Sequence, residues 1–211
     1  IIYAIYRYNL NKKLEMERMR VRIASDLHDE VGSMLSGLAM QGELLAESSG
    51  KSEKPKLEKI AGQGREVLSK MRDLVWSIDS RRDTVQNLLD RMREILEELL
   101  YPKDIRFEFE TGELPLNKDL PVNIRQHLFL IFKEAVTNVV RHSNADHVYV
   151  YVGNLNQDFV MIIKDNGSQS LHPSTTGMGI LNMKMRADKI GATLQTQHED
   201  GYLVRLTMKK L

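Results

Sequence analysis

Residues 132–142 read FKEAVTNVVRH, and this stretch predicts an amphipathic helix in the second half of the chain. Glu134, Asn138 and His142 recur at every fourth residue, so they share one face of that helix. The opposite face is apolar and comprises Leu128, Phe132, Ala135, Val136, Val139 and Val140, with Leu130 and Ile131 straying toward the polar side. We expect a helix from Pro121 to His142 that buries one side and displays polar groups on the other.

Sequence patterns typical of β-strands surround this helix. Period-two alternation, or a short apolar run, marks residues 105–110, 147–152, 159–163 and 203–208. Residues 179–190 predict a further helix that ends at Gly191. The expected fold class of this half is therefore mixed α+β, a sandwich in which helices cover one face of a sheet.

The first half of the chain is helical by the same criteria. Helices are expected at residues 9–47, 56–78 and, after the N-cap Thr84, up to Leu100, with a loop at 48–55 and a polar hinge at 79–83. An apolar stripe is formed by Ile23, Leu27, Val31, Met34, Leu35, Leu38 and Leu45. One hairpin has too little core, so we expect a dimeric four-helix bundle, a homodimer through residues 10–78. The alternative is a monomer whose downstream domain covers the stripe.

Composition narrows the classes of function. Thirty basic and 29 acidic residues give a net charge of +1, which argues against direct nucleic-acid binding. The absence of cysteine excludes disulfides and fits a reducing compartment. Residues 1–8, IIYAIYRY, are followed by Lys12 and Lys13, a pattern typical of the cytoplasmic end of a membrane span. We expect an upstream membrane and sensor segment, the alternative being an ordinary helix start.

His28 in the segment Asp26-Leu27-His28-Asp29-Glu30 is a candidate nucleophile. Small residues lie one helical turn before and after it, which keeps space open around the ring. Asp29 can accept the ring N–H and so orient the other nitrogen toward a phosphorus centre. Taken alone, a surface histidine beside an aspartate is usually a solvated residue.

Three further segments carry groups suited to phosphate chemistry. The carboxamide of Asn138 suits Mg²⁺, and Arg141 and His142 would face phosphate charge. Asp165-Asn166-Gly167 follows an apolar strand, and the carboxylate of Asp165 can accept a hydrogen bond from the amino group of a base. Gly177-Met178-Gly179 stands where a helix begins, so backbone N–H groups can approach phosphate. Each segment alone has a plain reading: a surface helix, a generic turn, a helix start.

In this order, the four segments resemble the H, N, G1 and G2 boxes of two-component sensor histidine kinases, in the subfamily whose H box reads like Asp-Leu-His-Asp-x-Val-Gly. The likeness covers residues 20–211. It implies a membrane-proximal signalling helix at 1–20, a dimerisation and phosphotransfer hairpin at 21–78, a hinge at 79–83 and a Bergerat-type ATP-binding domain at 84–211.

The same resemblance implies the substrates, the partners and the site. ATP with Mg²⁺ would phosphorylate His28, an aspartate of a response regulator receiver domain would take the phosphoryl group, and the protein would work at the cytoplasmic face of the membrane. The implied roles are Asp29 as acid/base, Glu134 as polar activator, Asn138 on Mg²⁺, Asp165 on adenine, and Gly167, Gly177, Gly179 and Ile180 around the nucleotide.

Two positions depart from the subfamily pattern. Ser33 stands five residues after His28, where glutamine is frequent and is associated with dephosphorylation of the regulator. Gln169 stands where the G1 box usually has a second glycine. Two other functions stay open: an ATPase of the same fold that does not phosphorylate itself, and a degenerate kinase that serves as a dimeric scaffold.

Overall fold

The computed structural model describes residues 2–27, 31–48, 53–79, 83–167, 178–198 and 200–209. The chain forms two compact units, Ile1–Arg82 and Asp83–Leu211. The hinge expected at residues 79–83 stays a prediction, because residues 80–82 lie outside the described part.

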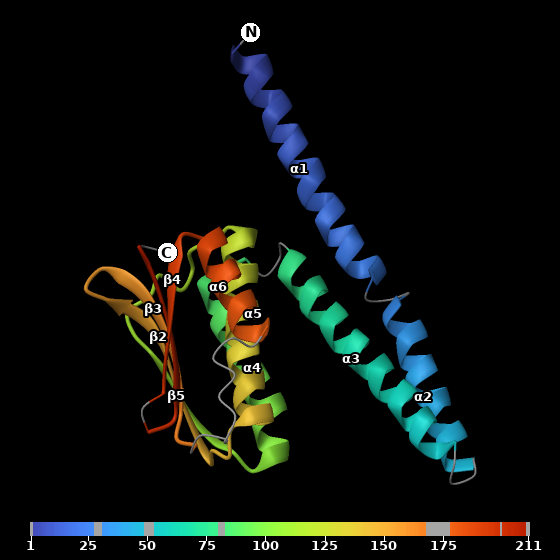
Figure 1. Cartoon of the computed structure of the whole chain (residues 1–211). Helices are drawn as coiled ribbons and strands as arrows, with labels where there is room; N and C mark the ends of the chain where they lie inside the picture. The colour runs from blue at the N-terminus through green and yellow to red at the C-terminus, as the bar shows by residue number, and fades with distance from the viewer. Residues whose placement is uncertain are drawn as a thin grey trace. The chain divides into compact units, whose positions relative to one another are not determined.

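The described residues of the first unit form three helices: α1 (Ile2–Asp26), α2 (Gly32–Ser48) and α3 (Lys54–Ile78) (Figure 1). Helices α2 and α3 pack as an antiparallel hairpin through small residues. A Cβ placed on Gly42 would lie 3.2 Å from the Cβ of Ala61, and one on Gly64 would lie 3.4 Å from the Cβ of Ala39. These glycines therefore let the two helix backbones approach closely, which explains Gly64 in an otherwise helical pattern.

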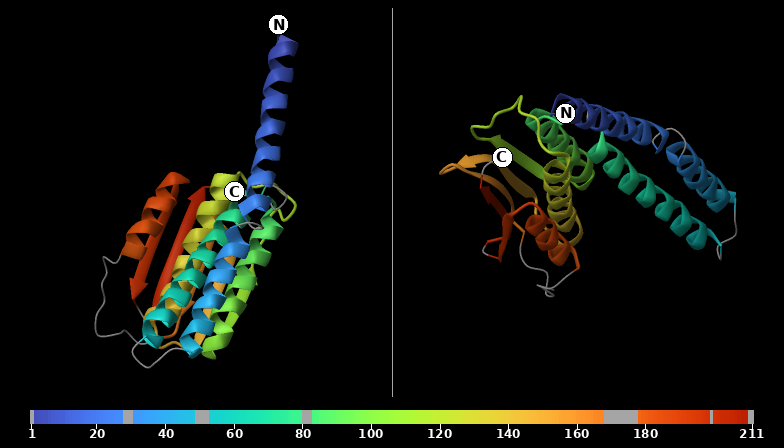
Figure 2. Two further views of the ribbon diagram at one scale, coloured as in Figure 1. Left: turned by 90° about the vertical axis from the view of Figure 1, so that its right-hand side faces the viewer. Right: turned by 90° about the horizontal axis from the view of Figure 1, so that it is seen from above.

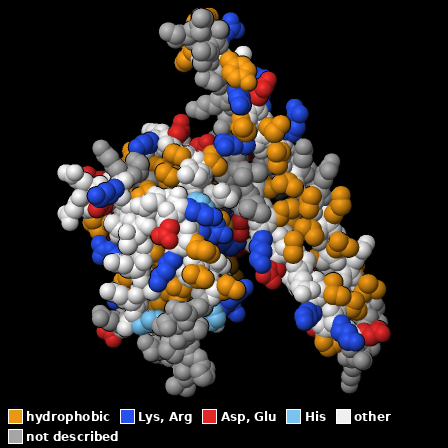
Figure 3. Space-filling view, turned by 45° about the horizontal axis from the view of Figure 1, so that its top comes forward, with side chains coloured by type: hydrophobic (Ala, Val, Ile, Leu, Met, Phe, Trp, Pro, Cys, Tyr) orange, Lys and Arg blue, Asp and Glu red, His pale blue; other side chains and the backbone are white. Residues whose placement is uncertain are grey.

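Because small residues close the hairpin, most of the large apolar side chains of the predicted stripe stay exposed. Figure 3 shows hydrophobic side chains gathered along the helical unit. The exposed ones from the stripe are Ile23, Val31, Met34, Leu38 and Leu45, and α3 adds Ile60 and Val67. Leu27 and Leu35 are half-buried. The hairpin thus has an apolar face that the packing of α2 against α3 does not bury.

The second unit is an α+β sandwich, which confirms the expected fold class. Its elements are α4 (Val85–Leu100), the short helix η3 (Tyr101–Lys103), β1 (Arg106–Thr111), α5 (Val122–His142), β2 (His147–Leu155), β3 (Asp158–Asp165), α6 (Met178–Lys189), β4 (Ala192–His198) and β5 (Tyr202–Lys209). The strand order is β1-β2-β3-β5-β4, with β1 and β2 parallel and the other pairs antiparallel. Helices α4, α5 and α6 cover one face of the sheet (Figures 1 and 2).

Local signals in the sequence fix several ends of these helices. The side chain of Thr84 accepts a hydrogen bond from the backbone N of Asn87 at 3.2 Å, so Thr84 is the N-cap that was predicted for α4. Gly191, with φ +66°, follows α6 in the left-handed conformation that glycine favours.

The structure corrects two expectations. Strand β4 was not predicted, because its polar residues leave only a weak alternating pattern; it is an edge strand that pairs with β5, for example Leu194 with Leu206. Ile131, placed toward the polar side of α5 by the sequence, is fully buried. The buried face of α5 is therefore wider than predicted, and it also includes Phe129 and the charged Arg125.

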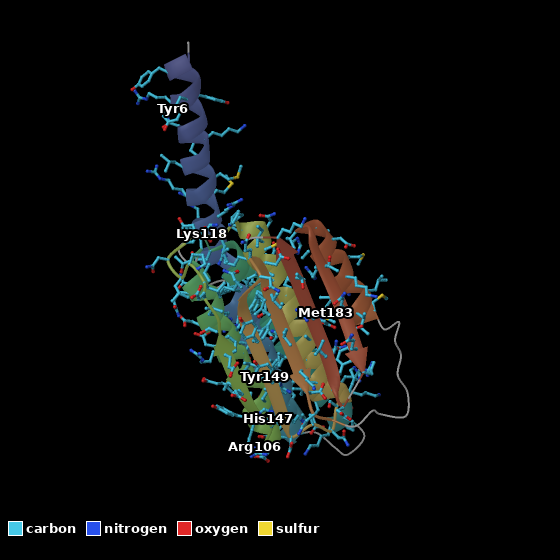
Figure 4. All side chains as sticks on the ribbon, turned by 90° about the vertical axis from the view of Figure 1, so that its left-hand side faces the viewer. Tyr6, Arg106, Lys118, His147, Tyr149 and Met183 are labelled. Carbon is cyan, nitrogen blue, oxygen red and sulfur yellow. The ribbon has the colours of Figure 1, made fainter. Side chains whose placement is uncertain are left out.

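The open face of the sheet carries a polar cross-strand pair. The Tyr149 hydroxyl donates a hydrogen bond to Glu110 Oε2 at 2.6 Å, and Figure 4 shows Tyr149 on β2 in line with His147. This hydrogen bond is the main cause that raises the pKa of Tyr149 to about 12, with burial and the charges of Glu110 and Glu108 adding to it.

We expect Glu110→Gln to lower the pKa of Tyr149 toward the ordinary value of 10.0. The raised pKa means that the neutral phenol contributes stability below pH 10, and that this contribution is lost as the pH rises toward 12. Titration of tyrosinate absorbance in the wild type, Glu110→Gln and Tyr149→Phe measures the shift. An unchanged titration in Glu110→Gln would contradict the assignment.

His127 lies on α5 near two cations of α6. Burial is the main cause that lowers the pKa of His127, and the charges of Arg186 and Lys189 lower it further. The native state therefore binds a proton less readily than the unfolded chain, and its stability falls as the pH drops below 6.5 toward the folded pKa.

We expect the unfolding free energy of the second unit to fall between about pH 7.5 and pH 5.5, and His127→Gln to reduce this fall. Urea unfolding at the two pH values measures the effect. An identical pH dependence in His127→Gln would assign the fall to other groups.

Candidate functional site

Helix α5 brings its polar residues against the start of α6. A Cβ on Gly179 would overlap Glu134 Oε1 and would lie 3.6 Å from Asn138 Nδ2. Glu134, Asn138 and Gly179 are all half-buried. The side chain that Gly179 lacks is therefore what allows the first turn of α6 to approach the acid and the amide of α5.

A second cluster forms where α5 and β3 end. Asp165, the last residue of β3, is 2% exposed. Its Oδ1 accepts a hydrogen bond from Ser143 Oγ at 2.8 Å and another from the backbone N of Gly167 at 2.8 Å. Its Oδ2 is buried and has no hydrogen-bond partner among the described residues.

This unpaired oxygen is unusual for a buried carboxylate. An ionised carboxylate can only accept hydrogen bonds, and a buried acceptor left without a donor costs about 1–3 kcal/mol. The geometry fits a ligand that supplies one hydrogen-bond donor to Asp165 Oδ2.

Asn166 holds the neighbouring backbone in place. Its Oδ1 accepts hydrogen bonds from the backbone N of Asp146 at 3.1 Å and of His147 at 3.0 Å. Its Nδ2 donates to Asp146 Oδ1 at 2.7 Å, and this hydrogen bond is the main cause that lowers the pKa of Asp146. The Asp-Asn-Gly segment is thus tied to the start of β2 rather than forming a free turn.

The turn between β4 and β5 also reaches this cluster. Gly201 has φ +118°, and a Cβ there would overlap the carbonyl oxygen of Asp165. Lys164 pairs with Leu203, so the register brings Tyr202 beside Asp165. Burial is the main cause that raises the pKa of Tyr202, and the charge of Asp165 adds to it.

Ser143 and Tyr202 are the residues of this cluster that sequence reasoning missed. Ser143 directly follows the predicted helix, but its contact with a strand 22 residues further along the chain has no local signal in the sequence. Tyr202 lies next to Gly201 at the start of a predicted strand, but the pairing of that strand with β3 was not readable from the sequence.

The other predicted site residues lie around these two clusters or outside the described part. Arg141 and His142 are exposed on the last turn of α5, and Ile180 is half-buried on α6. His28, Asp29 and Gly177 lie outside the described residues.

Glu134 and Ser143 are nine positions apart on or next to α5, which at about 1.5 Å per residue corresponds to roughly 13 Å. The structure therefore offers two polar clusters along one helix, one around Asn138 and one around Asp165.

Within the described residues no group of three His, Asp or Glu side chains could hold a metal ion by itself. Mg²⁺ usually completes its coordination shell with substrate phosphates and water. A single amide ligand from the protein, such as Asn138, is therefore compatible with Mg²⁺ binding.

No helix in the described part is long and apolar enough to cross a membrane.

A family model described as histidine kinase matches residues 19–83. These residues cover the hairpin and the segment that contains His28.

Similar proteins agree with this match. The sensor histidine kinase DesK of Bacillus subtilis is 30% identical over 218 residues, which cover 96% of this chain and 56% of DesK. The sensor histidine kinase YvfT of the same organism is 29% identical over 201 residues, covering 93% of this chain and 52% of YvfT. The chain thus spans about half the length of these curated relatives.

A solved structure shares the fold. The histidine kinase domain of a blue-light activated histidine kinase from Erythrobacter litoralis superposes with a TM-score of 0.55 at 14% identity, covering 84% of this chain and 94% of that domain.

Proposed function

This chain belongs to the histidine kinase family, and from that premise we propose that it binds Mg·ATP in the unit 83–211 and transfers the γ-phosphoryl group to His28. The observation that carries the proposal is Asp165 Oδ2, a buried acceptor without a partner among the described residues, at the end of a sheet covered by α5 and α6.

The residues present fit the nucleotide. The amino group of adenine would supply the donor that Asp165 Oδ2 lacks. The close approach of α6 to α5 at Gly179 puts backbone N–H groups of a helix start beside Asn138, where phosphates and Mg²⁺ would be held. Arg141 and His142, both exposed, would neutralise phosphate charge. Gly167, Gly177 and Ile180 would line the nucleotide.

Transfer to His28 is an in-line displacement. One ring nitrogen of His28 attacks the γ-phosphorus, the bond from phosphorus to the β–γ bridging oxygen breaks, and ADP leaves. Asp29 would accept a hydrogen bond from the N–H of the other ring nitrogen and so hold the imidazole in the reactive tautomer, and it would take that proton as the phosphorus–nitrogen bond forms. Mg²⁺ held by Asn138 would neutralise charge on the phosphates, and Glu134, next to Asn138, would act as the polar activator.

The phosphoryl group would then pass to an aspartate of a response regulator receiver domain. We infer that the protein acts as a homodimer through residues 10–78, because Met34, Leu38 and Leu45 stay exposed after α2 and α3 have packed through small residues. In this arrangement residues 1–20 are a membrane-proximal signalling helix, 21–78 the phosphotransfer hairpin, 79–83 the hinge and 84–211 the ATP-binding domain at the cytoplasmic face of the membrane.

Incubation of the chain with γ-labelled ATP and Mg²⁺ tests the proposal. We expect label on the protein that is lost in acid and kept in base, as the phosphorus–nitrogen bond of phosphohistidine requires. Steady release of phosphate without labelled protein would instead support an ATPase of the same fold. Failure to bind the nucleotide at all would support a degenerate scaffold.

A further inference from the structure

We propose that Ser143 is a positioning residue for base recognition: its hydroxyl fixes the carboxylate of Asp165 so that Oδ2 alone is presented to the amino group of adenine. The inference rests on the proposed function, since it assumes that Asp165 reads the base. It concerns selectivity among nucleotides rather than the phosphoryl transfer itself.

The position of Ser143 at the end of α5 makes this contact possible. Its backbone N still donates to Val139 O at 2.9 Å, while its own φ of −104° and ψ of 146° are extended. The residue therefore closes the helix and turns away from it. Its side chain reaches β3, 22 residues further along the chain, where it meets Asp165.

The direction of the hydroxyl hydrogen is set by a second hydrogen bond. The backbone N of Ala145 donates to Ser143 Oγ at 3.2 Å, so one lone pair of that oxygen is occupied. The hydroxyl hydrogen then points to Asp165 Oδ1 at 2.8 Å, a charge-assisted contact. Ser143 thus links the backbone that follows α5 to the carboxylate at the end of β3.

Two donors on one oxygen fix the plane of the carboxylate and leave the other oxygen free. The two oxygens are equivalent, but the last torsion of an aspartate has only broad, two-fold preferences, so the plane is not fixed by the torsion itself. Ser143 Oγ and the backbone N of Gly167 both donate to Oδ1, which holds the carboxylate in one orientation. Without the hydroxyl, the N–H of Gly167 would hold it alone, and Oδ2 would be less well aimed.

Gly167 makes room for this hydroxyl. A Cβ on Gly167 would overlap Ser143 Oγ, and it would lie 2.9 Å from the backbone N of Ala145 and 3.0 Å from Asp165 Oδ1. The glycine that directly follows the Asp-Asn pair is therefore required by the serine as well as by the nucleotide.

The test compares two ligands that differ only at the group Asp165 would read. Binding of the β,γ-imido analogue of ATP with Mg²⁺, and of the matching analogue with unsubstituted purine as base, is measured by calorimetry on the whole chain. We expect Ser143→Ala to weaken the adenine analogue about tenfold or more, the scale of a lost hydrogen bond to a charged group, and the purine analogue by less than about twofold.

Three variants make the result specific. Thr193→Ala removes an exposed hydroxyl from β4 and should change neither affinity. Ser143→Cys keeps the size of the side chain with a weaker donor and should give an intermediate selective loss. In an Asp165→Ala background, Ser143→Ala should cause no further loss for the adenine analogue, because the two residues act as one unit.

The outcomes separate the inference from the proposed function. If the wild type binds both analogues equally, Asp165 does not read the amino group and the proposed role of that site fails. If the wild type prefers adenine but Ser143→Ala and Ser143→Cys weaken both ligands equally, or neither, Ser143 is merely structural and the inference is overturned.

Discussion

Replacing His28 with glutamine is expected to abolish the acid-labile label while leaving the affinity for Mg·ATP unchanged within about twofold. Glutamine is polar like histidine, but its amide nitrogen is not a nucleophile and cannot form the phosphorus–nitrogen bond. The groups proposed to hold the nucleotide, among them Asn138 and Asp165, belong to the other unit of the chain. Binding and transfer should therefore separate in this variant.

The matched control is His147→Gln. His147 lies at the start of β2 on the open face of the sheet, where Figure 4 shows it below Tyr149. This change removes one imidazole from the chain without touching the candidate nucleophile, so labelling should persist. Label that is lost in acid and kept in base, and that survives His28→Gln, would rule out His28 as the phosphoacceptor.

The elements of the second unit were largely predictable because their signals are local. Thr84 caps α4 through a contact only three residues away, and Gly191 ends α6 through its own backbone conformation. Strand β4 escaped prediction because an edge strand need not be apolar: Thr193, Gln195 and Gln197 face solvent, and its place depends on pairing with β5.

The candidate site was predictable as a set of residue types but not as an arrangement. The sequence indicates that Asp165 carries a carboxylate for a ligand, whereas the pairing of Oδ1 with Ser143 joins residues 22 positions apart. That tertiary contact and the local hydrogen bond from Gly167 N both go to Oδ1, and Oδ2 is left unpaired.

The helical hairpin shows the same limit. Periodicity identifies the stripe that contains Met34 and Leu38 but does not tell which face closes the hairpin. The contacts of Gly42 with Ala61 and of Gly64 with Ala39 show that the small residues do so. The larger apolar residues of the stripe stay exposed, and the proposed homodimer rests on this observation.

Replacing the buried Arg125 should strongly reduce the stability of the second unit. A helical arginine is ordinarily expected at the surface, yet the side chain of Arg125 is 0% exposed and its Nη2 lies 2.7 Å from Asp83 Oδ1. The backbone around Asp83 is held as well, since Leu120 N donates to Asp83 O at 2.6 Å. The ion pair thus fastens the first residues of the unit to α5.

We expect Arg125→Met to lower the unfolding free energy of this unit by about 3–5 kcal/mol, because it leaves a largely buried carboxylate without its cation. Hydrogen exchange of the β3 amides measures this loss, and fluorescence of Trp76, the single tryptophan, follows the other unit as an internal reference. Removing both partners, in Asp83→Ala with Arg125→Met, should cost less than the sum of the single changes, since the two charges are coupled.

The exposed pair of Arg106 and Asp146 provides the matched control for this prediction. Arg106 Nη2 lies 3.5 Å from Asp146 Oδ2, and the two side chains are 78% and 68% exposed. The side chains of Arg125 and Asp83 are 0% and 20% exposed. Water screens such a pair, so Arg106→Met should change the unfolding free energy by less than about 1 kcal/mol. If Arg125→Met changed the unfolding free energy no more than Arg106→Met does, burial would not strengthen the Asp83–Arg125 pair. The first residues of the unit would then be held by backbone contacts alone, such as that of Leu120 N with Asp83 O.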